Sequence, residues 1–290
     1  MGRPMPTAPT PRDDRILAPT RWTAVAIVPV LTAAFVILYV FPDRTRQLWA
    51  WEIRPSMTAV FMGGGYLAGA YFFTRVARVR EWHRIGAGLV AITVFTAALM
   101  AATVLHWDRF NHGHVSFWAW LLLYATTPFL LPWLWATNRR TDPGTPPPGD
   151  TRIPRPLRIA VGAGGCAQLA LAGALFAFPT RVAERWPWAL TPLTARALGA
   201  FIAFPAVAWI WFLVDDRWSS HRIVQQMVAV GFVLIGLGSL RARDQFDHYP
   251  RYLAGLAAAL ALTVALHLAM DRRARGPAPS AARQRLDHDP

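Results

Sequence analysis

The chain alternates long apolar runs with short polar segments. Between flanking charged residues or histidines it has eight apolar runs of 18 to 24 residues, at 22–42, 55–74, 85–105, 115–138, 159–180, 197–214, 223–240 and 252–270. No run contains Asp, Glu or Arg, and the only histidine in them is His267. A helix that crosses a bilayer needs about 20 apolar residues, and continuous runs without period-two alternation exclude a membrane barrel. The pattern predicts an all-α integral membrane protein with eight transmembrane helices.

The composition agrees with this class. Charged residues make up 16% of the chain and the mean hydropathy is +0.28, whereas a soluble protein carries about 25% charged residues. The net charge is +14, and every basic residue is arginine. The arginines lie between the apolar runs and at the two ends, so we expect the lipid bilayer, and not nucleic acid, as the partner.

The distribution of arginine predicts the orientation. Eight spans place both termini on one side, and 20 of the 30 arginines lie in the segments on that side. Cytoplasmic loops carry the excess of positive charge. We therefore expect a protein of the bacterial cytoplasmic (inner) membrane with both termini inside.

Two stretches repeat at an offset of 137 residues, FPDRTRQLWAWEIRP (41–55) and FPTRVAERWPWALTP (178–192), which share F-P-x-R-x4-W-x-W-x3-P. A second pair, 108–112 and 244–248, shares D-x-F-[ND]-H, and Trp82-His83-Arg84-Ile85 has a gapped counterpart in Trp218 and His221-Arg222-Ile223. The matches predict two tandem four-helix repeats related by a pseudo-two-fold axis along the membrane normal. The expected organisation is a disordered cytoplasmic tail (1–21), a first repeat (22–137), a cytoplasmic linker (138–156), a second repeat (157–270) and a second disordered cytoplasmic tail (271–290).

The W-x-W motif has two interpretations. Tryptophan suits the headgroup layer and arginine can reach phosphate, so an aromatic belt at the membrane interface accounts for the motif. The functional alternative is a site for a lipid headgroup or ligand, formed by Arg44, Trp49, Trp51, Arg181, Trp186 and Trp188.

The D-x-F-[ND]-H pair also has two interpretations. Imidazole and carboxylate are zinc ligands, so Asp108, His112, His114, Asp244 and His248 are candidate metal ligands at the outer mouth of the bundle. The structural alternative is that Asp and Asn cap the following helices and satisfy loop N–H groups. The spacing matches no established zinc motif, so the sequence predicts no defined cofactor and leaves a metal open.

Glycines cluster in three of the apolar runs. They form Gly65-x-x-x-Gly69, the group Gly162, Gly164 and Gly165, and the pair Gly236 and Gly238. Small residues allow membrane helices to approach closely, so the clusters favour packing within the bundle or between protomers. A homo-oligomer or another membrane protein is therefore a candidate partner.

One segment resembles a known group of proteins. The run Trp188-Ala189-Leu190-Thr191-Pro192-Leu193-Thr194-Ala195-Arg196 is similar to a W-x-L-T-P-L-T-A-R pattern in uncharacterised bacterial multi-pass membrane proteins. The resemblance implies a membrane location and no activity.

Two functions are compatible with these patterns. The first is a non-catalytic membrane module that binds or moves a small apolar or amphipathic molecule, or that scaffolds a partner. Intramembrane carboxylates, which mark ion-coupled pathways, are absent from the eight apolar runs. The alternative is a membrane enzyme with an outward-facing metal site built from the paired D-x-F-[ND]-H loops.

Overall fold

The structure, a computed structural model, describes residues 12–275 and is all α-helical in its main elements. Eight long helices account for most of these residues: α1 (Ala18–Phe35, continued by a π-helical turn, Val36–Val40), α3 (Ser56–Arg78), α4 (His83–Leu105), α5 (Val115–Asn138), α6 (Arg155–Ala177), α8 (Pro192–Ile210), α9 (Trp218–Ser239) and α10 (Tyr249–Arg275). Two short helices, α2 (Thr45–Leu48) and α7 (Pro179–Ala183), and 3-10 turns lie in the connections.

Seven of the long helices are long and apolar enough to cross a membrane, and α3 is the exception. The expected membrane class is thereby confirmed, whereas the eighth span stays a prediction. The position of α3 explains its composition, because 14 of its 23 residues are buried inside the protein. A helix surrounded by other helices needs no lipid-facing surface and can carry glycine, serine and tyrosine.

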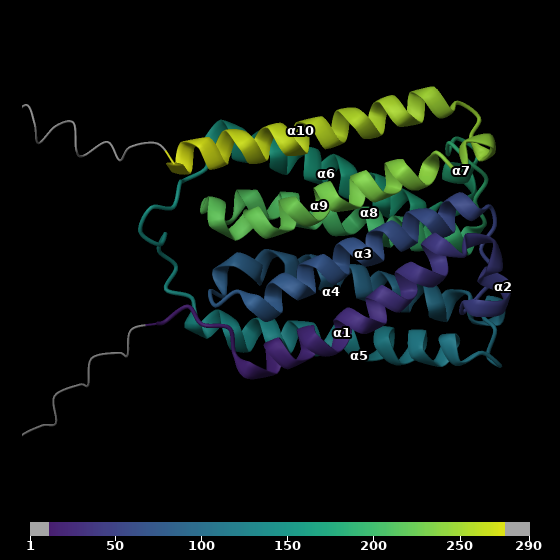
Figure 1. Ribbon diagram of the computed structural model, residues 1–290, viewed down its shortest axis with the longest axis horizontal. Coiled ribbons are helices and arrows are strands. Elements are labelled where there is room, and N and C mark those ends of the chain that lie inside the picture. The colour runs from purple at the N-terminus through teal and green to yellow at the C-terminus, as the bar shows by residue number, and fades with distance from the viewer. Residues whose placement is uncertain (1–11, 276–290) are drawn as a thin grey trace, which may run out of the picture.

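The long helices lie roughly side by side in one bundle (Figure 1). The centre is formed by α3, α4, α8 and α9, since α3 packs on α9 and α4 packs on both α8 and α9. On one flank α1 packs on α3 and α5 packs on α4; on the other, α6 packs on α8 and α10 packs on α9. Both ends of the described chain and the 138–156 linker lie at the same end of the bundle, and α2 and α7 lie at the opposite end (Figure 1). We call these the terminal end and the loop end.

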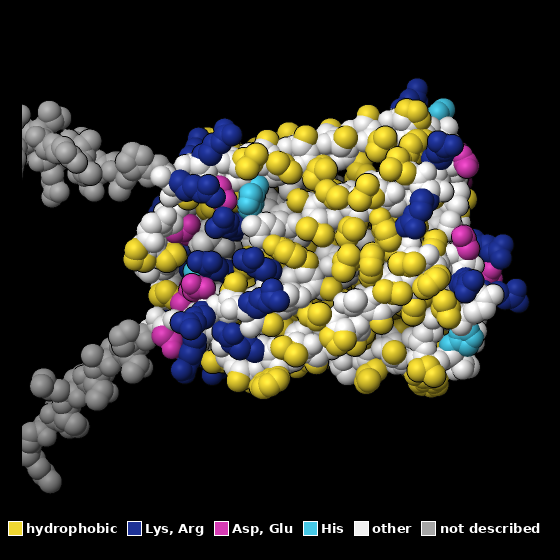
Figure 2. Space-filling view, in the orientation of Figure 1, with side chains coloured by type: hydrophobic (Ala, Val, Ile, Leu, Met, Phe, Trp, Pro, Cys, Tyr) yellow, Lys and Arg dark blue, Asp and Glu magenta, His cyan; other side chains and the backbone are white. Residues whose placement is uncertain are grey.

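The surface agrees with a bundle embedded in lipid. Figure 2 shows apolar side chains across the middle of the visible face, with arginines and acidic residues gathered at its two ends. Large apolar side chains such as Phe129, Leu262 and Leu122 are more than two-thirds exposed. An apolar surface of this extent is typical of contact with a bilayer.

The helices extend beyond the apolar runs. Arg75 and Arg78 lie in the last turn of α3, and His83, Arg155 and Trp218 begin α4, α6 and α9. A charged residue ends an apolar run but does not end a helix, because its long side chain can reach out to the polar layer.

Parts of both expected tails have a defined structure. Residues 1–11 and 276–290 lie outside the described residues, but the prediction of a tail up to residue 21 is wrong for 12–21, because α1 begins at Ala18 and Ile16 N donates to Arg80 O at 2.9 Å. Likewise α10 continues to Arg275, past the predicted boundary at 270. The sequence missed these segments because their order comes from contacts with distant residues.

Close approach between α6 and α8 requires glycine at two positions. A methyl group on Gly165 would lie 2.8 Å from Ala206 O, and one on Gly199 would lie 2.9 Å from Ala172 O. The packing expected for the glycine cluster of α6 is therefore present at Gly165.

Several backbone contacts occur in both halves of the chain. Trp82 N donates to Asp14 O at 2.7 Å, and Trp218 N donates to Thr151 O at 3.0 Å. The guanidinium of Arg21 donates to the carbonyls of Ala77 and Val79, as the guanidinium of Arg158 donates to those of Phe212 and Leu213. The residues that take the same place in the two sets of contacts are 134 to 137 residues apart in the sequence.

Candidate functional site

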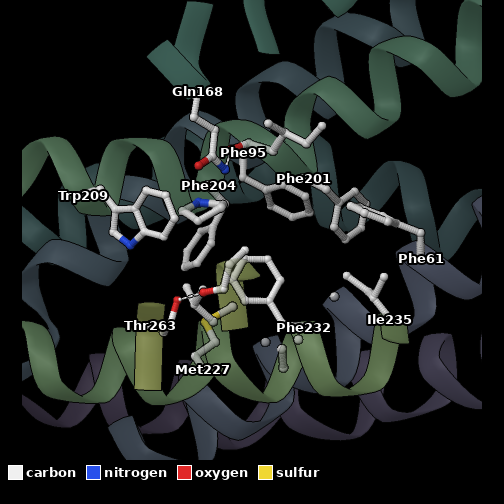
Figure 3. A pocket seen from close by; sticks show the side chains of 18 of the residues that line it. Phe61, Phe95, Gln168, Phe201, Phe204, Trp209, Met227, Phe232, Ile235 and Thr263 are labelled. Atoms are coloured by element: carbon white, nitrogen blue, oxygen red, sulfur yellow. Dashed lines mark hydrogen bonds between the residues drawn. The ribbon is translucent and has the colours of Figure 1, made fainter. Parts of the chain in front are cut away.

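A large cavity of the described structure lies between the central helices and the flank made by α6 and α10. Its volume is about 1080 Å³. Figure 3 shows Phe201, Phe204 and Trp209 of α8 on one side, and Met227, Phe232 and Ile235 of α9 on the other, with their side chains directed at the space between them. Ligand pockets in proteins typically measure about 300–1,000 Å³, so the cavity can hold a sizeable molecule.

The wall of the cavity is almost entirely apolar. Among the lining residues the structure describes, Arg251 is the only charged one, and none is Asp, Glu, His, Ser or Cys. The two glutamines are already engaged: Gln168 Nε2 donates to Ile202 O at 3.1 Å, and Gln225 Oε1 accepts from Trp209 Nε1 at 3.2 Å. An apolar group is therefore the natural occupant.

Small residues on the facing sides of α6 and α10 leave the space. Ala160, Gly164 and Ala167 lie on one face of α6, since residues three and four apart are neighbours on a helix, and all three line the cavity. Gly255 and Ala259 do the same on α10. A side chain added at Gly164 or Gly255 would meet no atom within 4 Å. These glycines therefore border open space, unlike the tightly packed Gly165.

The rim at the loop end carries polar groups. Trp186, Trp188, Arg251 and Tyr252 line the cavity there. Trp188 Nε1 donates to Thr58 Oγ1 at 2.8 Å. The indole nitrogen of Trp186 and the hydroxyl of Tyr252 are buried and have no hydrogen-bond partner within the described structure. Because such groups are costly to leave unpaired, both are candidates for contact with a ligand.

A second, smaller cavity adjoins the rim. It is lined by Leu171, Phe178, Arg181, Val182, Arg185, Trp186 and Pro187. Leu171 and Trp186 line both cavities. The guanidinium of Arg181 lies 5.8 Å from the ring centre of Phe178. The apolar cavity is thus adjacent to a smaller cavity that arginines line.

Three of the four tryptophans of the repeated motif lie in the protein core. Trp49, Trp51 and Trp188 are at most 6% exposed, so an aromatic belt in the headgroup layer is the wrong interpretation for these three rings. Trp49 and Trp51 instead pack edge-on against Trp120, with ring centres 5.7 and 4.8 Å apart. Burial and packing of aromatic rings against each other stabilise the protein more than exposure of the rings in the headgroup layer does.

The predicted ligand residues therefore separate into two groups. Arg181, Trp186 and Trp188 of the second half line the cavities. Trp49 and Trp51 do not line either one, and Arg44 is exposed with its guanidinium 5.7 Å from the ring of Phe41. The structure thus brings together three of the six residues.

The D-x-F-[ND]-H segments bind the W-x-W loops. Asn111 N donates to Ala50 O at 2.8 Å, and Asp247 N donates to Pro187 O at 3.0 Å. Phe110 packs on Trp51 and Phe246 packs on Trp188, with ring centres 5.1 and 5.2 Å apart. The two sequence motifs are therefore parts of one loop-to-loop contact in each half.

The five candidate metal ligands do not form a cluster. Within residues 12–275 no group of three or more His, Cys, Asp and Glu side chains could hold a metal ion. His112 stacks near Trp107 and Phe117, and Asp244 forms an exposed ion pair with Arg243 at 3.7 Å. His114, His248 and Asp108 are not brought to a common centre with them, so the metal site stays a prediction without geometric support.

Asp108 and Asp244 do not cap the following helices either. The helix after the first motif begins at Val115, and its N-cap His114 makes no side-chain cap bond. Asp108 and Asp244 both lie exposed in 3-10 turns. The sequence could not show this, because an aspartate near a helix start has the same local pattern whether or not it caps.

Sequence reasoning missed a polar network at the terminal end. His83 Nδ1 contacts Asp14 Oδ2, and His83 Nε2 lies 2.8 Å from Ser219 Oγ, which donates to Asp150 Oδ2 at 2.5 Å. The two aspartates also accept from the backbone N–H groups at the starts of α4 and α9. The sequence match paired His83 with His221, but Trp82 and Trp218 lie 136 apart, and the same spacing pairs His83 with Ser219.

Comparisons with protein-family models, curated proteins and solved structures gave no match to this chain. The geometry of the site therefore carries the functional argument alone.

Proposed function

We propose that the protein is a non-catalytic membrane module that binds or moves a small apolar or amphipathic molecule in the cavity bordered by α6 and α10. The observation that carries the proposal is a cavity of about 1080 Å³ with an almost wholly apolar wall inside a membrane protein. General acid–base and nucleophilic chemistry needs titratable or nucleophilic side chains. The lining residues supply a binding surface for a hydrocarbon chain more readily than a reaction centre.

The flank of α6 and α10 is the proposed entry from the bilayer. Both helices line the cavity, yet α6 packs chiefly on α8 and α10 chiefly on α9. At the terminal end they meet around Trp218, where Leu157 and Val161 of α6 join Leu266 and Met270 of α10. Only two residues of α10, Thr263 and Met270, are buried. Because α10 is held mainly at one end and by one neighbouring helix, the hydrocarbon chain of a ligand can enter beside it.

Filling the cavity should abolish binding. Gly164→Trp places an indole in open space at the cavity wall, so we expect the dissociation constant of a neutral chain-bearing probe, dioleoylglycerol, to rise about tenfold or more, a loss of about 1.4 kcal/mol. Native mass spectrometry of the full chain in detergent measures the bound fraction.

The matched control lies on the same helix. Gly173 also has no atom within 4 Å of an added side chain, but it does not line the cavity. Gly173→Trp should therefore bind the probe as the wild type does. Equal binding by wild type, Gly164→Trp and Gly173→Trp would contradict a ligand site in the cavity.

We further infer that the two halves, residues 22–137 and 157–270, arose by tandem duplication. The support is a set of similar contacts at similar sequence positions, among them the Trp82 and Trp218 backbone bonds and the Arg21 and Arg158 guanidinium bonds. The contacts between the helices agree with this. A two-fold rotation that exchanges α3 with α8 and α4 with α9 turns the α3–α9 contact into the α4–α8 contact. An experimental structure in which the axis relating the halves lies in the membrane plane would rule out the parallel repeat.

The proposed topology places the terminal end in the cytoplasm of a bacterium and all eight long helices across its inner membrane. This orientation is supported by the excess of arginine in the segments at that end, because cytoplasmic loops carry the excess of positive charge. Reporter fusions after Arg80 and Arg272 should give a cytoplasmic signal, and fusions near Trp49 or His112 should give a signal from the other side. A cytoplasmic signal at His112 would contradict the topology.

A further inference from the structure

We propose that the rim at the loop end binds the anionic head, a phosphate or carboxylate, of the amphipathic molecule whose chain occupies the cavity. The inference rests on the proposed function and names the ligand class for the same site. The proposed head site includes Trp186, Arg251 and Tyr252 of the rim together with Arg181 and Arg185 of the smaller cavity, and we count these two arginines as part of the rim from here on.

The charged residues that line the rim are all arginines. Arg181, Arg185 and Arg251 form no ion pair or side-chain hydrogen bond with any residue of the range 12–275, in which salt bridges do engage Arg54, Arg84, Arg152, Arg217 and Arg222. No Asp or Glu of the described chain lines either cavity. The rim therefore attracts anions.

The uncharged polar groups of the rim are suited to the same partner. An indole N–H can only donate a hydrogen bond, and a phenol O–H readily does so. Trp186 Nε1 and the hydroxyl of Tyr252 are buried without a partner. Each of these donors matches an oxygen atom of a phosphate or carboxylate as its acceptor, and guanidinium groups bind such oxygens through strong, charge-assisted bonds.

The position of the rim fits an amphipathic ligand. Trp186 and Leu171 line both the apolar cavity and the arginine-bearing one, so the two cavities are adjacent and the head and chain of one ligand have neighbouring sites. A quaternary ammonium head, which aromatic rings can also bind, is disfavoured here because three arginines would repel it. The geometry thus selects an anion over a cation.

The test compares two lipids with identical chains. Dioleoyl phosphatidic acid carries a phosphate, and dioleoylglycerol lacks it. We expect the full-length protein in detergent to bind the phosphatidic acid about tenfold or more tightly than the diacylglycerol, because the guanidinium groups form charge-assisted bonds with the phosphate that the diacylglycerol cannot form. The double variant Arg181→Gln/Arg185→Gln should lose this preference and bind both lipids about equally.

The first half supplies the matched control. Arg44 and Arg46 are exposed arginines of the equivalent loop, and neither lines a cavity. The double variant Arg44→Gln/Arg46→Gln should keep the preference for phosphatidic acid, which shows that the loss in the other variant is not a general effect of reduced charge.

Three other outcomes separate the proposals. Equal binding of the two lipids by the wild type, with both weakened by Gly164→Trp, would overturn the anionic head and leave the cavity function standing. Binding of neither lipid, or binding that Gly164→Trp does not change, would overturn the cavity function itself. Inorganic phosphate alone that competes with phosphatidic acid at similar concentration would show a free-anion site and overturn the amphipathic ligand.

Discussion

Replacing Arg217 by alanine should destabilise the protein more than any other single arginine substitution at the terminal end. The Arg217 side chain is 9% exposed and bonds both oxygens of Asp142, at 2.8 and 3.0 Å, while it also bonds Asp215 at 2.8 Å. Asp142 follows α5 and Asp215 precedes α9, so the arginine joins the segment after α5 to the segment before α9. Removal of one member of a buried ion pair leaves uncompensated charge and costs about 3–5 kcal/mol.

Thermal unfolding in detergent, followed by tryptophan fluorescence, measures the effect of Arg217→Ala. The control is Arg152→Ala, because Arg152 is paired with Arg217 in an isolated β-bridge but its side chain is 67% exposed where it meets Asp216. An exposed ion pair is worth about 0–1 kcal/mol, so Arg152→Ala should change the midpoint little. Equal midpoints for the two variants would show that the buried network contributes no stability.

The same network should give stability a specific dependence on pH. Burial opposes ionisation of Asp142 and Asp215, but hydrogen bonds and charge from Arg217 outweigh it and lower the pKa of both carboxyls below the usual 3.8. A carboxyl with a lowered folded-state pKa contributes stability that is present above its unfolded pKa and is lost as the pH falls through its folded pKa. The wild-type midpoint should therefore hold between about pH 7 and pH 5 and fall below about pH 4.

In Arg217→Ala, the contribution of these two carboxyls to the pH dependence of stability should have the opposite sign. Without the guanidinium, burial and mutual repulsion raise the pKa of the two carboxyls, so protonation relieves the destabilisation. The difference in midpoint between wild type and variant should then shrink as the pH falls from 7 to 4, and groups common to both proteins cancel in this difference. A difference that stays constant over that range would contradict the assignment of the network.

The sequence predicted the helices well and their ends poorly. Apolar runs identify each long helix because lipid and core both demand apolar surface. The run that begins at residue 223 misses Trp218 and His221 at the start of α9, because polar residues in a first turn are held by contacts elsewhere, such as the bond from His221 Nε2 to Asp215 O. Such contacts have no local signature.

The cavity could be predicted only in part. The glycine cluster of α6 indicated close helix packing, and Gly165 does pack against α8. Gly164, its neighbour in the sequence, faces the cavity instead, because adjacent residues on a helix point about 100° apart. Which of the two faces the neighbouring helix depends on the position of α8 and α10, which the sequence pattern does not specify.

The polar network at the terminal end was beyond the sequence pattern. Asp14, His83 and Ser219 meet although 69 and 136 residues separate them along the chain. In the sequence, only the 136-residue offset between Trp82 and Trp218 indicates the pairing of His83 with Ser219, and an alignment with a gap after Trp218 pairs His83 with His221 instead. Contacts between halves of a bundle are determined by packing, not by neighbouring residues.

The most direct test of a chain-binding cavity is photo-cross-linking with a phosphatidic acid that carries a diazirine at the end of one acyl chain. Reconstituted protein would be irradiated and the modified peptides identified by mass spectrometry. We expect labelling of cavity residues of the central helices, such as Phe204 and Met227, which are at most 7% exposed, and loss of that labelling in Gly164→Trp but not in Gly173→Trp. Labelling confined to outward-facing residues such as Leu122 and Phe129 would contradict a ligand chain inside the bundle.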